Sequence, residues 1–136
     1  MLLEVTEMKC IDSSAIVKYL SREEGWEALR DDLLDSTTIE LAVKELSNAF
    51  WVKVRKKDVE FKDALHIISE FNNNAVLVSQ SEFLPTAFKI SVEHGITVYD
   101  SLFIAVAVVK ECELVTCDAK QAEVAKKVGV AVKFYK

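Results

Sequence analysis

Short apolar segments alternate with longer helical segments along most of the chain. The apolar segments cover residues 8–12, 75–79, 113–118 and 130–134, and the intervening segments carry hydrophobic residues at helical spacing. A strand with one face in water alternates apolar and polar residues, whereas these segments are largely apolar throughout. This pattern predicts a mainly parallel sheet that helices cover on both faces. Residues 36–40 are expected to cap a helix or to form a further brief strand.

Seven helices are expected between and around these strands. On one of them, residues 58–74, we expect the four large apolar side chains to face inward, and these are Phe61, Leu65, Ile68 and Phe71. The expected helices cover residues 13–21, 22–35, 41–57, 58–74, 81–95, 101–111 and 119–129.

The composition fits one globular domain over residues 1–136. Hydrophobic residues make up 51% of the chain and charged residues 29%, proportions that exclude the disordered and collagen-like classes. The first residues, "MLLEVTEMK", have no basic segment followed by an apolar core, and no apolar run approaches the roughly 20 residues of a membrane span. We therefore expect a cytoplasmic protein without a membrane segment.

The net charge and the cysteines narrow the classes of function. A net charge of −5 argues against a large, passive nucleic-acid-binding surface, but permits a nucleic-acid enzyme whose divalent metal supplies positive charge. Cys10, Cys112 and Cys117 form no C-x-x-C pair, which disfavours a structural zinc site. Buried core thiols are the expected role, with a redox role or a disulfide as the alternatives.

Acidic residues stand where the predicted strands give way to helices. Asp12 follows the first strand, Asp118 follows a later one, and Asp100 follows the short piece 96–99, predicted to be extended, at the start of helix 101–111. Active sites of parallel sheets gather beyond the carboxyl ends of the strands. An Asp in such a place also caps a helix. Capping accounts easily for one acid, and less well for three that face the same rim.

A fourth acid, Glu45, lies on the predicted helix 41–57. Glu45 and Asn48 are three residues apart and share a face beside the apolar stripe, where an ordinary surface position is the alternative interpretation. Four carboxylates at close range raise one another's pKa values unless a cation lies between them, and only Lys120 is near the three junctions. Oxygen ligands favour Mg²⁺ or Mn²⁺. We therefore expect a divalent metal site.

Four motifs occur in a set order along the chain: "CIDSSAIVKYL", "KELSNAFW", "YDSLFIAVA" and "LVTCDAK". Together they resemble the PIN-domain ribonucleases, most closely the VapC toxins of VapBC toxin–antitoxin pairs, and the likeness runs from Met8 to Phe134. The resemblance implies an α/β/α sandwich with an acidic pocket that binds Mg²⁺ or Mn²⁺. It also implies metal-dependent endoribonuclease cleavage of RNA.

The resemblance assigns four catalytic acids and three supporting hydrogen-bond partners. The acids are Asp12, Glu45, Asp100 and Asp118, and the supporting residues are Ser14, Asn48 and Thr116. Asp12, Asp100 and Asp118 would hold the metal, while Glu45 would either bind it or orient the attacking water.

This chain departs from some relatives directly after the last acid. Where they have a further acid, it has Ala119, Lys120 and Gln121, and Glu123 is the nearest candidate substitute. The number of metal ions therefore stays open.

Partners and alternatives follow from the same resemblance. Relatives act on RNA, pair with themselves and bind a small antitoxin, so an RNA substrate, a homodimer and an antitoxin partner are expected. The alternatives are a housekeeping RNA-processing or quality-control nuclease and a catalytically silent PIN-fold binding module. A haloacid-type phosphatase is disfavoured because its D-x-D motif is replaced here by Asp12-Ser13-Ser14, and a receiver domain because adjacent acids after the first strand are missing.

Overall fold

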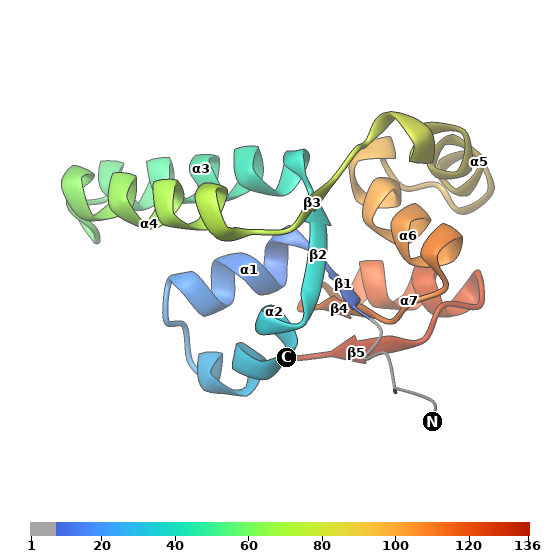
Figure 1. Cartoon of the computed structure of the whole chain (residues 1–136), viewed down its shortest axis with the longest axis horizontal. Coiled ribbons are helices and arrows are strands. Elements are labelled where there is room, and N and C mark those ends of the chain that lie inside the picture. Colours follow the sequence, from blue (N-terminus) through green and yellow to red (C-terminus); the bar gives the residue numbers. More distant parts are fainter. Residues whose placement is uncertain (1–7) are drawn as a thin grey trace, which may run out of the picture.

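A five-stranded sheet forms the centre of the protein, whose computed structural model describes residues 8–136 (Figure 1). The strands lie in the order β3-β2-β1-β4-β5, and every neighbouring pair is parallel. The strands are β1 (Lys9–Ile11), β2 (Ser36–Ile39), β3 (Leu77–Val78), β4 (Leu114–Thr116) and β5 (Val132–Phe134). The predicted parallel sheet is confirmed, and residues 36–39 form a strand rather than a cap.

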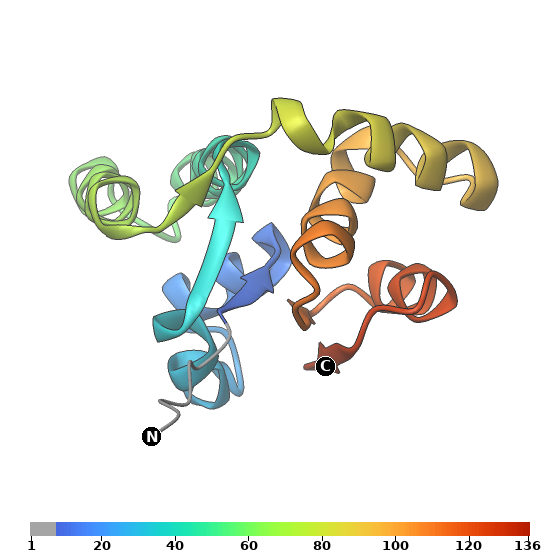
Figure 2. The ribbon, with the colours of Figure 1, turned by 45° about the vertical axis from the view of Figure 1, so that its right-hand side comes forward.

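Helices cover both faces of this sheet. Figure 2 shows α1 and α2 on one side and α6 and α7 on the other, which confirms the predicted α/β/α sandwich. The helices are α1 (Ser13–Leu20), α2 (Arg30–Leu34), α3 (Glu40–Arg55), α4 (Phe61–Asn74), α5 (Leu84–His94), α6 (Val98–Lys110) and α7 (Ala119–Lys127), with short 3₁₀ helices η1 (Trp26–Leu29) and η2 (Ser81–Phe83).

The most apolar helix, α6, lies in the middle of the packing. Every residue from Ser101 to Ala107 is buried, and α6 contacts α5, α7, β1 and β4. A helix that is apolar on all sides needs neighbours on all sides, and this arrangement supplies them. No single helix among residues 8–136 is long and apolar enough to cross a membrane, whereas α5 (with η2) and α6, bent by 118° at their junction, would meet that criterion together on length and composition alone.

One predicted helix and one predicted extended segment differ from the structure. The single helix over residues 22–35 is wrong, because Gly25 adopts a left-handed φ of 84° and the segment divides into a turn, η1 and α2. The extended piece at 96–99 is also wrong, since Val98 and Tyr99 already belong to α6.

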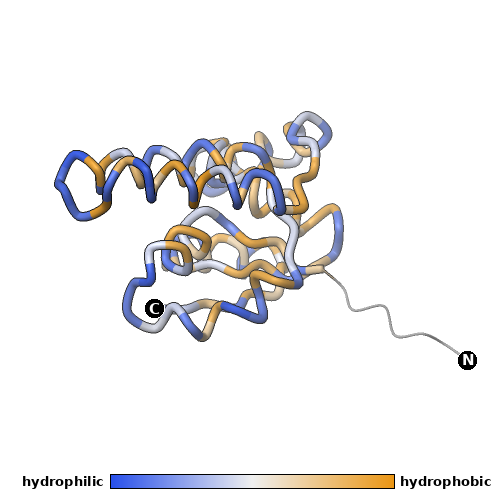
Figure 3. Tube along the Cα trace, turned by 60° about the vertical axis from the view of Figure 1, so that its left-hand side comes forward, coloured by the Kyte–Doolittle hydropathy of each residue, from blue (hydrophilic) through white to orange (hydrophobic). Residues whose placement is uncertain are grey.

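The inward face predicted for α4 is only partly correct. Ile68 and Phe71 pack against the core, but Phe61 is 69% exposed and Leu65 is 51% exposed, and Ala64 is the buried residue of this helix. The reason lies in the hairpin of α3 and α4, which projects beyond the sheet (Figure 1). Figure 3 shows hydrophobic residues interspersed along this hairpin. The first turns of α4 therefore bury Ala64 and leave Phe61 and Leu65 exposed.

The cysteines occupy core or near-core positions. Cys10 and Cys112 are buried, as the core role predicts, and Cys117 is half-buried. None of the three forms a disulfide with another described residue.

Candidate active site

Asp12 and Asp118 lie where the neighbouring strands β1 and β4 end. Each is the N-cap of the helix that follows: Asp12 Oδ1 accepts a hydrogen bond from the Ala15 N–H at 3.1 Å, and Asp118 Oδ1 accepts one from the Gln121 N–H at 3.0 Å. Capping and a place on the carboxyl rim of the sheet are thus compatible.

Asp100 reaches the same rim by a different route. It lies in the first turn of α6, and the N-cap is Thr97, whose hydroxyl oxygen accepts a hydrogen bond from the Asp100 N–H at 3.2 Å. The interpretation of Asp100 as a helix cap is therefore wrong. Because Thr97 already satisfies the free backbone donor, the Asp100 carboxylate is not used as a cap.

The Asp12 carboxylate is buried and held on both oxygens. Asp12 is 3% exposed; its Oδ1 accepts a hydrogen bond from the Ser14 hydroxyl at 2.7 Å and its Oδ2 one from the Thr116 hydroxyl at 2.5 Å. Ser14 Oγ is itself anchored by the Cys117 N–H at 2.9 Å. Ser14 and Thr116 thus make the supporting contacts that the sequence predicted, and they leave Asp12 one orientation.

Glu45 is half-buried on α3 and is held from α1. The Ser13 hydroxyl donates to Glu45 Oε1 at 3.0 Å, a contact that the sequence analysis did not predict. Its only signal in the sequence is the place of Ser13 between Asp12 and Ser14. Asn48, one turn further along α3, is exposed and its side chain forms no hydrogen bond with another described residue, so its supporting role stays a prediction.

Charges among the four acids contribute to the raised pKa values in this group. These acids, called the acidic cluster below, are Asp12, Glu45, Asp100 and Asp118. Burial raises the pKa of Asp12 to about 6; the hydrogen bonds from Ser14 and Thr116 oppose this rise, and the charge of Asp118 adds to it. Burial also raises the pKa of Glu45, with a contribution from the charge of Asp100, and raises that of Asp100, with a contribution from Asp118. Like-charge contributions therefore link the four acids in series, Asp12 to Asp118, Asp118 to Asp100 and Asp100 to Glu45.

Comparison with known proteins identifies the architecture around this cluster. The family model of the PIN domain matches residues 9–127, a span that includes all four acids. The chain belongs to the PIN-domain family.

Two individual proteins illustrate the likeness. The chain is 31% identical over 119 residues to Ribonuclease VapC3 of Pyrobaculum aerophilum, a match covering 83% of this chain and 91% of that protein. The crystal structure of PAE2754 from the same organism superimposes with a TM-score of 0.74 at 21% identity, covering 92% of this chain and 83% of that one. The second match shows the fold, and the first confirms the predicted likeness to VapC proteins.

The donors of this PIN-domain site suit a hard divalent cation. All are carboxylate oxygens, none of the four acids forms an ion pair with a described Lys or Arg, and a cation would relieve their mutual repulsion. Asp12, Asp100 and Asp118 are the residues that would hold Mg²⁺ or Mn²⁺. The match is one of donor chemistry alone, because no three His, Cys, Asp or Glu side chains among residues 8–136 are placed so that they could hold a metal ion together.

The position after the last acid contributes no further acid to the cluster. Glu123, the candidate substitute, pairs instead with Lys127 at 3.2 Å on the exposed side of α7. Lys120 is exposed and forms no ion pair with another described residue.

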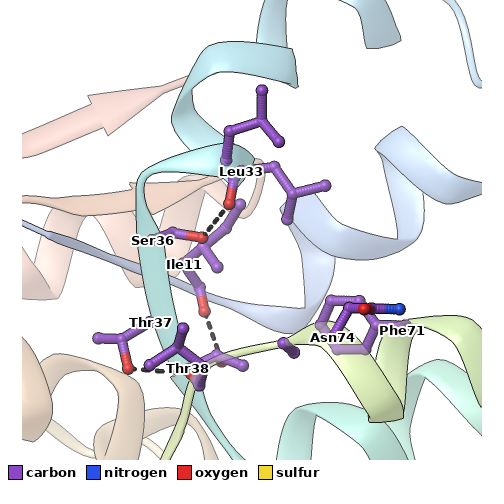
Figure 4. A pocket seen from close by; sticks show the side chains of 10 residues that line it. Ile11, Leu33, Ser36, Thr37, Thr38, Phe71 and Asn74 are labelled. Atoms are coloured by element: carbon purple, nitrogen blue, oxygen red, sulfur yellow. Dashed lines mark hydrogen bonds between the residues drawn. The ribbon is translucent and has the colours of Figure 1, made fainter.

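An apolar pocket of about 220 Å³ lies apart from the acidic cluster, between α2, β2 and the end of α4 (Figure 4). Its hydroxyl groups are already used: Ser36 donates to the Leu33 carbonyl oxygen, Thr37 to that of Val76 and Thr38 to that of Ile11. No titratable side chain lines it. It offers no acid–base chemistry, so the acidic cluster is the candidate active site.

Proposed function

We propose that this PIN domain is a metal-dependent endoribonuclease that hydrolyses RNA phosphodiesters. The observation that carries the proposal is a set of four electrostatically linked carboxylates, two following β1 and β4 and two on α3 and α6, with no described Lys or Arg paired to them. The ribonuclease name of the similar Pyrobaculum protein supports the same reaction class. Retaining such repulsion is costly to the fold, which favours a functional role for the cluster.

The residues of the acidic cluster would have different roles in the reaction, according to their surroundings. Bound Mg²⁺ or Mn²⁺ would supply a water of lowered pKa and neutralise charge on the phosphoryl oxygens. Asp12, fixed on both oxygens by Ser14 and Thr116, is a rigid ligand that cannot turn away. Asp100 and Asp118 are less buried and would complete the ligand set. Glu45 has one oxygen bound to Ser13 and the other available to orient the attacking water.

The reaction is tested with purified protein and single-stranded RNA. We expect cleavage with Mg²⁺ or Mn²⁺, its loss in EDTA, and its loss in Asp100→Asn. Asp63→Asn is the matched control, because Asp63 is an exposed acid in the first turn of another helix, α4. Cleavage that survives Asp100→Asn would contradict the metal-site assignment, and RNA binding without cleavage would favour the silent binding module.

We propose that the biological role is that of the toxin in a VapBC-type pair, in a single cytoplasmic domain over residues 1–136. Expression should then arrest growth, and co-expression of a small antitoxin encoded by an adjacent reading frame should relieve the arrest. Harmless expression of an active enzyme would favour the RNA-processing alternative.

Exposed apolar side chains support two partner surfaces. Leu84, Phe88 and Val92 form an exposed stripe at four-residue spacing on α5, which suits a homodimer in which the same stripe packs against its copy. Phe61 and Leu65 are exposed on the projecting hairpin, which suits an apolar segment of the antitoxin.

One substitution on each surface tests which partner binds there. Phe88→Asp should yield monomers in light scattering while antitoxin binding is retained. Leu65→Asp should abolish antitoxin binding while the dimer is retained. The opposite pattern would exchange the two assignments.

A further inference from the structure

Two consecutive serines at the start of α1 contact two different acids of the cluster. The Ser14 hydroxyl donates to Asp12 Oδ1 at 2.7 Å, within the same strand-to-helix junction. The Ser13 hydroxyl donates to Glu45 Oε1 at 3.0 Å, across to α3 and 32 positions along the chain. Consecutive helical residues point about 100° apart, so one turn of α1 reaches in two directions.

Glu45 depends on this contact more than Asp12 depends on any single one. Asp12 accepts hydrogen bonds from Ser14, Ala15 and Thr116, whereas among the described residues only Ser13 donates to the Glu45 carboxylate. A Glu side chain has more rotamer freedom to lose than an Asp side chain. One clamped oxygen therefore decides where the second oxygen of Glu45 points.

We propose that Ser13 is a positioning residue that holds Glu45 with Oε2 directed to the reaction. The inference rests on the proposed function, because Glu45 serves the reaction only if the cluster is catalytic. It assigns separate tasks to neighbouring residues: Ser14 holds Asp12, and Ser13 holds Glu45.

The kinetic test compares Ser13→Ala, Ser13→Thr and Ser21→Ala. Ser13→Ala should lower kcat roughly tenfold, since a hydrogen bond to a charged group is lost, and leave KM nearly unchanged. Ser13→Thr keeps the hydroxyl and should restore kcat. Ser21→Ala is the control, because Ser21 follows the same helix and its hydroxyl is buried with no hydrogen-bond partner among the described residues.

A structural readout separates this inference from the proposed function. In a crystal structure of Ser13→Ala, the Glu45 carboxylate should occupy more than one rotamer, with the backbone and melting temperature unchanged. If the wild-type protein does not cleave RNA, the proposed function fails and these rotamers alone decide whether Ser13 positions Glu45. An unchanged single rotamer, an unchanged kcat in Ser13→Ala, or a Thr variant as slow as the Ala variant would each overturn the inference.

Discussion

Carboxylates in this molecule occur in two contrasting surroundings. The acidic cluster gathers four carboxylates with no paired cation, whereas Asp32 on α2 is a single carboxylate surrounded by donors. Asp32 is 1% exposed and pairs with the ammonium groups of Lys9 at 2.5 Å and Lys133 at 3.0 Å, and Tyr135 donates its hydroxyl to the same carboxylate. These four residues, called the Asp32 cluster below, connect β1, α2, β5 and the residue that follows β5.

The pKa directions express the same contrast. Burial by itself would raise the pKa of Asp32, but hydrogen bonds from Lys9, Tyr135 and Lys133 bring it below its usual value. In the acidic cluster, burial and like charges raise the pKa of Asp12. Ionised Asp32 therefore stabilises the fold, and ionised Asp12 opposes it. One buried acid is neutralised by its neighbours, whereas the other retains an electrostatic cost, which favours the functional role proposed above.

The largest expected effect is on catalysis, from Asp12→Asn. Loss of the rigid ligand should lower kcat/KM for RNA at least ~1000-fold, because Asn is a poor ligand for Mg²⁺ or Mn²⁺. The free energy of unfolding in EDTA at pH 7 should not fall, since Asn caps a helix as well as Asp does and removes the buried charge. Cleavage assays and urea titrations measure the two. A clear loss of stability in Asp12→Asn would contradict the contrast between the two acids, because Asp12 would then stabilise the fold as Asp32 does.

The next effect is on stability, from Asp32→Ala. Removing the one acid beside two lysines should lower the free energy of unfolding by about 3 kcal/mol. Activity per folded molecule should be unchanged, because none of the Asp32 contacts reaches the acidic cluster. Asp31→Ala is the control, as Asp31 is the exposed neighbour on the same helix. A stable but inactive Asp32→Ala protein would contradict the separation of the two clusters.

A smaller effect is the pH dependence of the metal-free protein. The pKa of Asp12 is about 6 in the folded state and near its usual value of 3.8 in the unfolded state, so the folded state binds the proton more tightly. Stability should therefore rise by about 1 kcal/mol as the pH falls from 7.5 to 5 in EDTA. Asp32, whose folded pKa is lowered, loses its contribution only at more acidic pH. Urea titrations of the wild type and Asp12→Asn measure the difference, and an equal rise in both would assign it to other groups.

The smallest effect concerns Thr97, an uncharged residue that caps the helix turn carrying Asp100. Thr97→Ala should lower the free energy of unfolding by about 1 kcal/mol, because α6 loses its N-cap. Thr97→Ser should restore it. A thermal melt of the three proteins is sufficient, and equal melting temperatures would show that the cap contributes nothing to the first turn that holds Asp100.

The parts of the site that sequence could predict are those made by local patterns. Asp12 and Asp118 follow apolar strands, and Ser14 lies two residues from Asp12, the acid it supports. Thr116 lies two residues before Asp118 in the chain, but its hydroxyl supports Asp12 from the neighbouring strand. The local role of Asp100 differs from the predicted cap, because α6 begins earlier than the sequence suggests and Thr97 is its N-cap. Phe61 and Leu65 follow a helical period, but a period does not say whether a core lies opposite it.

Other parts depend on contacts between distant residues. The donors to Asp32 come from 23, 101 and 103 positions away, and the donor to Glu45 comes from 32 positions away. Nothing in the local sequence distinguishes Asp32 from its exposed neighbour Asp31. Its burial, and the lysines it meets, follow from how α2 packs against β1 and β5.

The sequence by itself determined the parallel α/β/α architecture, the four acids and the buried character of α6, because apolar periodicity and strand-end chemistry are written along neighbouring residues. The tertiary structure alone decided which acid is neutralised and which are left to repel one another. Charge pairing acts through space over a few ångströms, and only the fold brings residues more than a hundred positions apart within that distance.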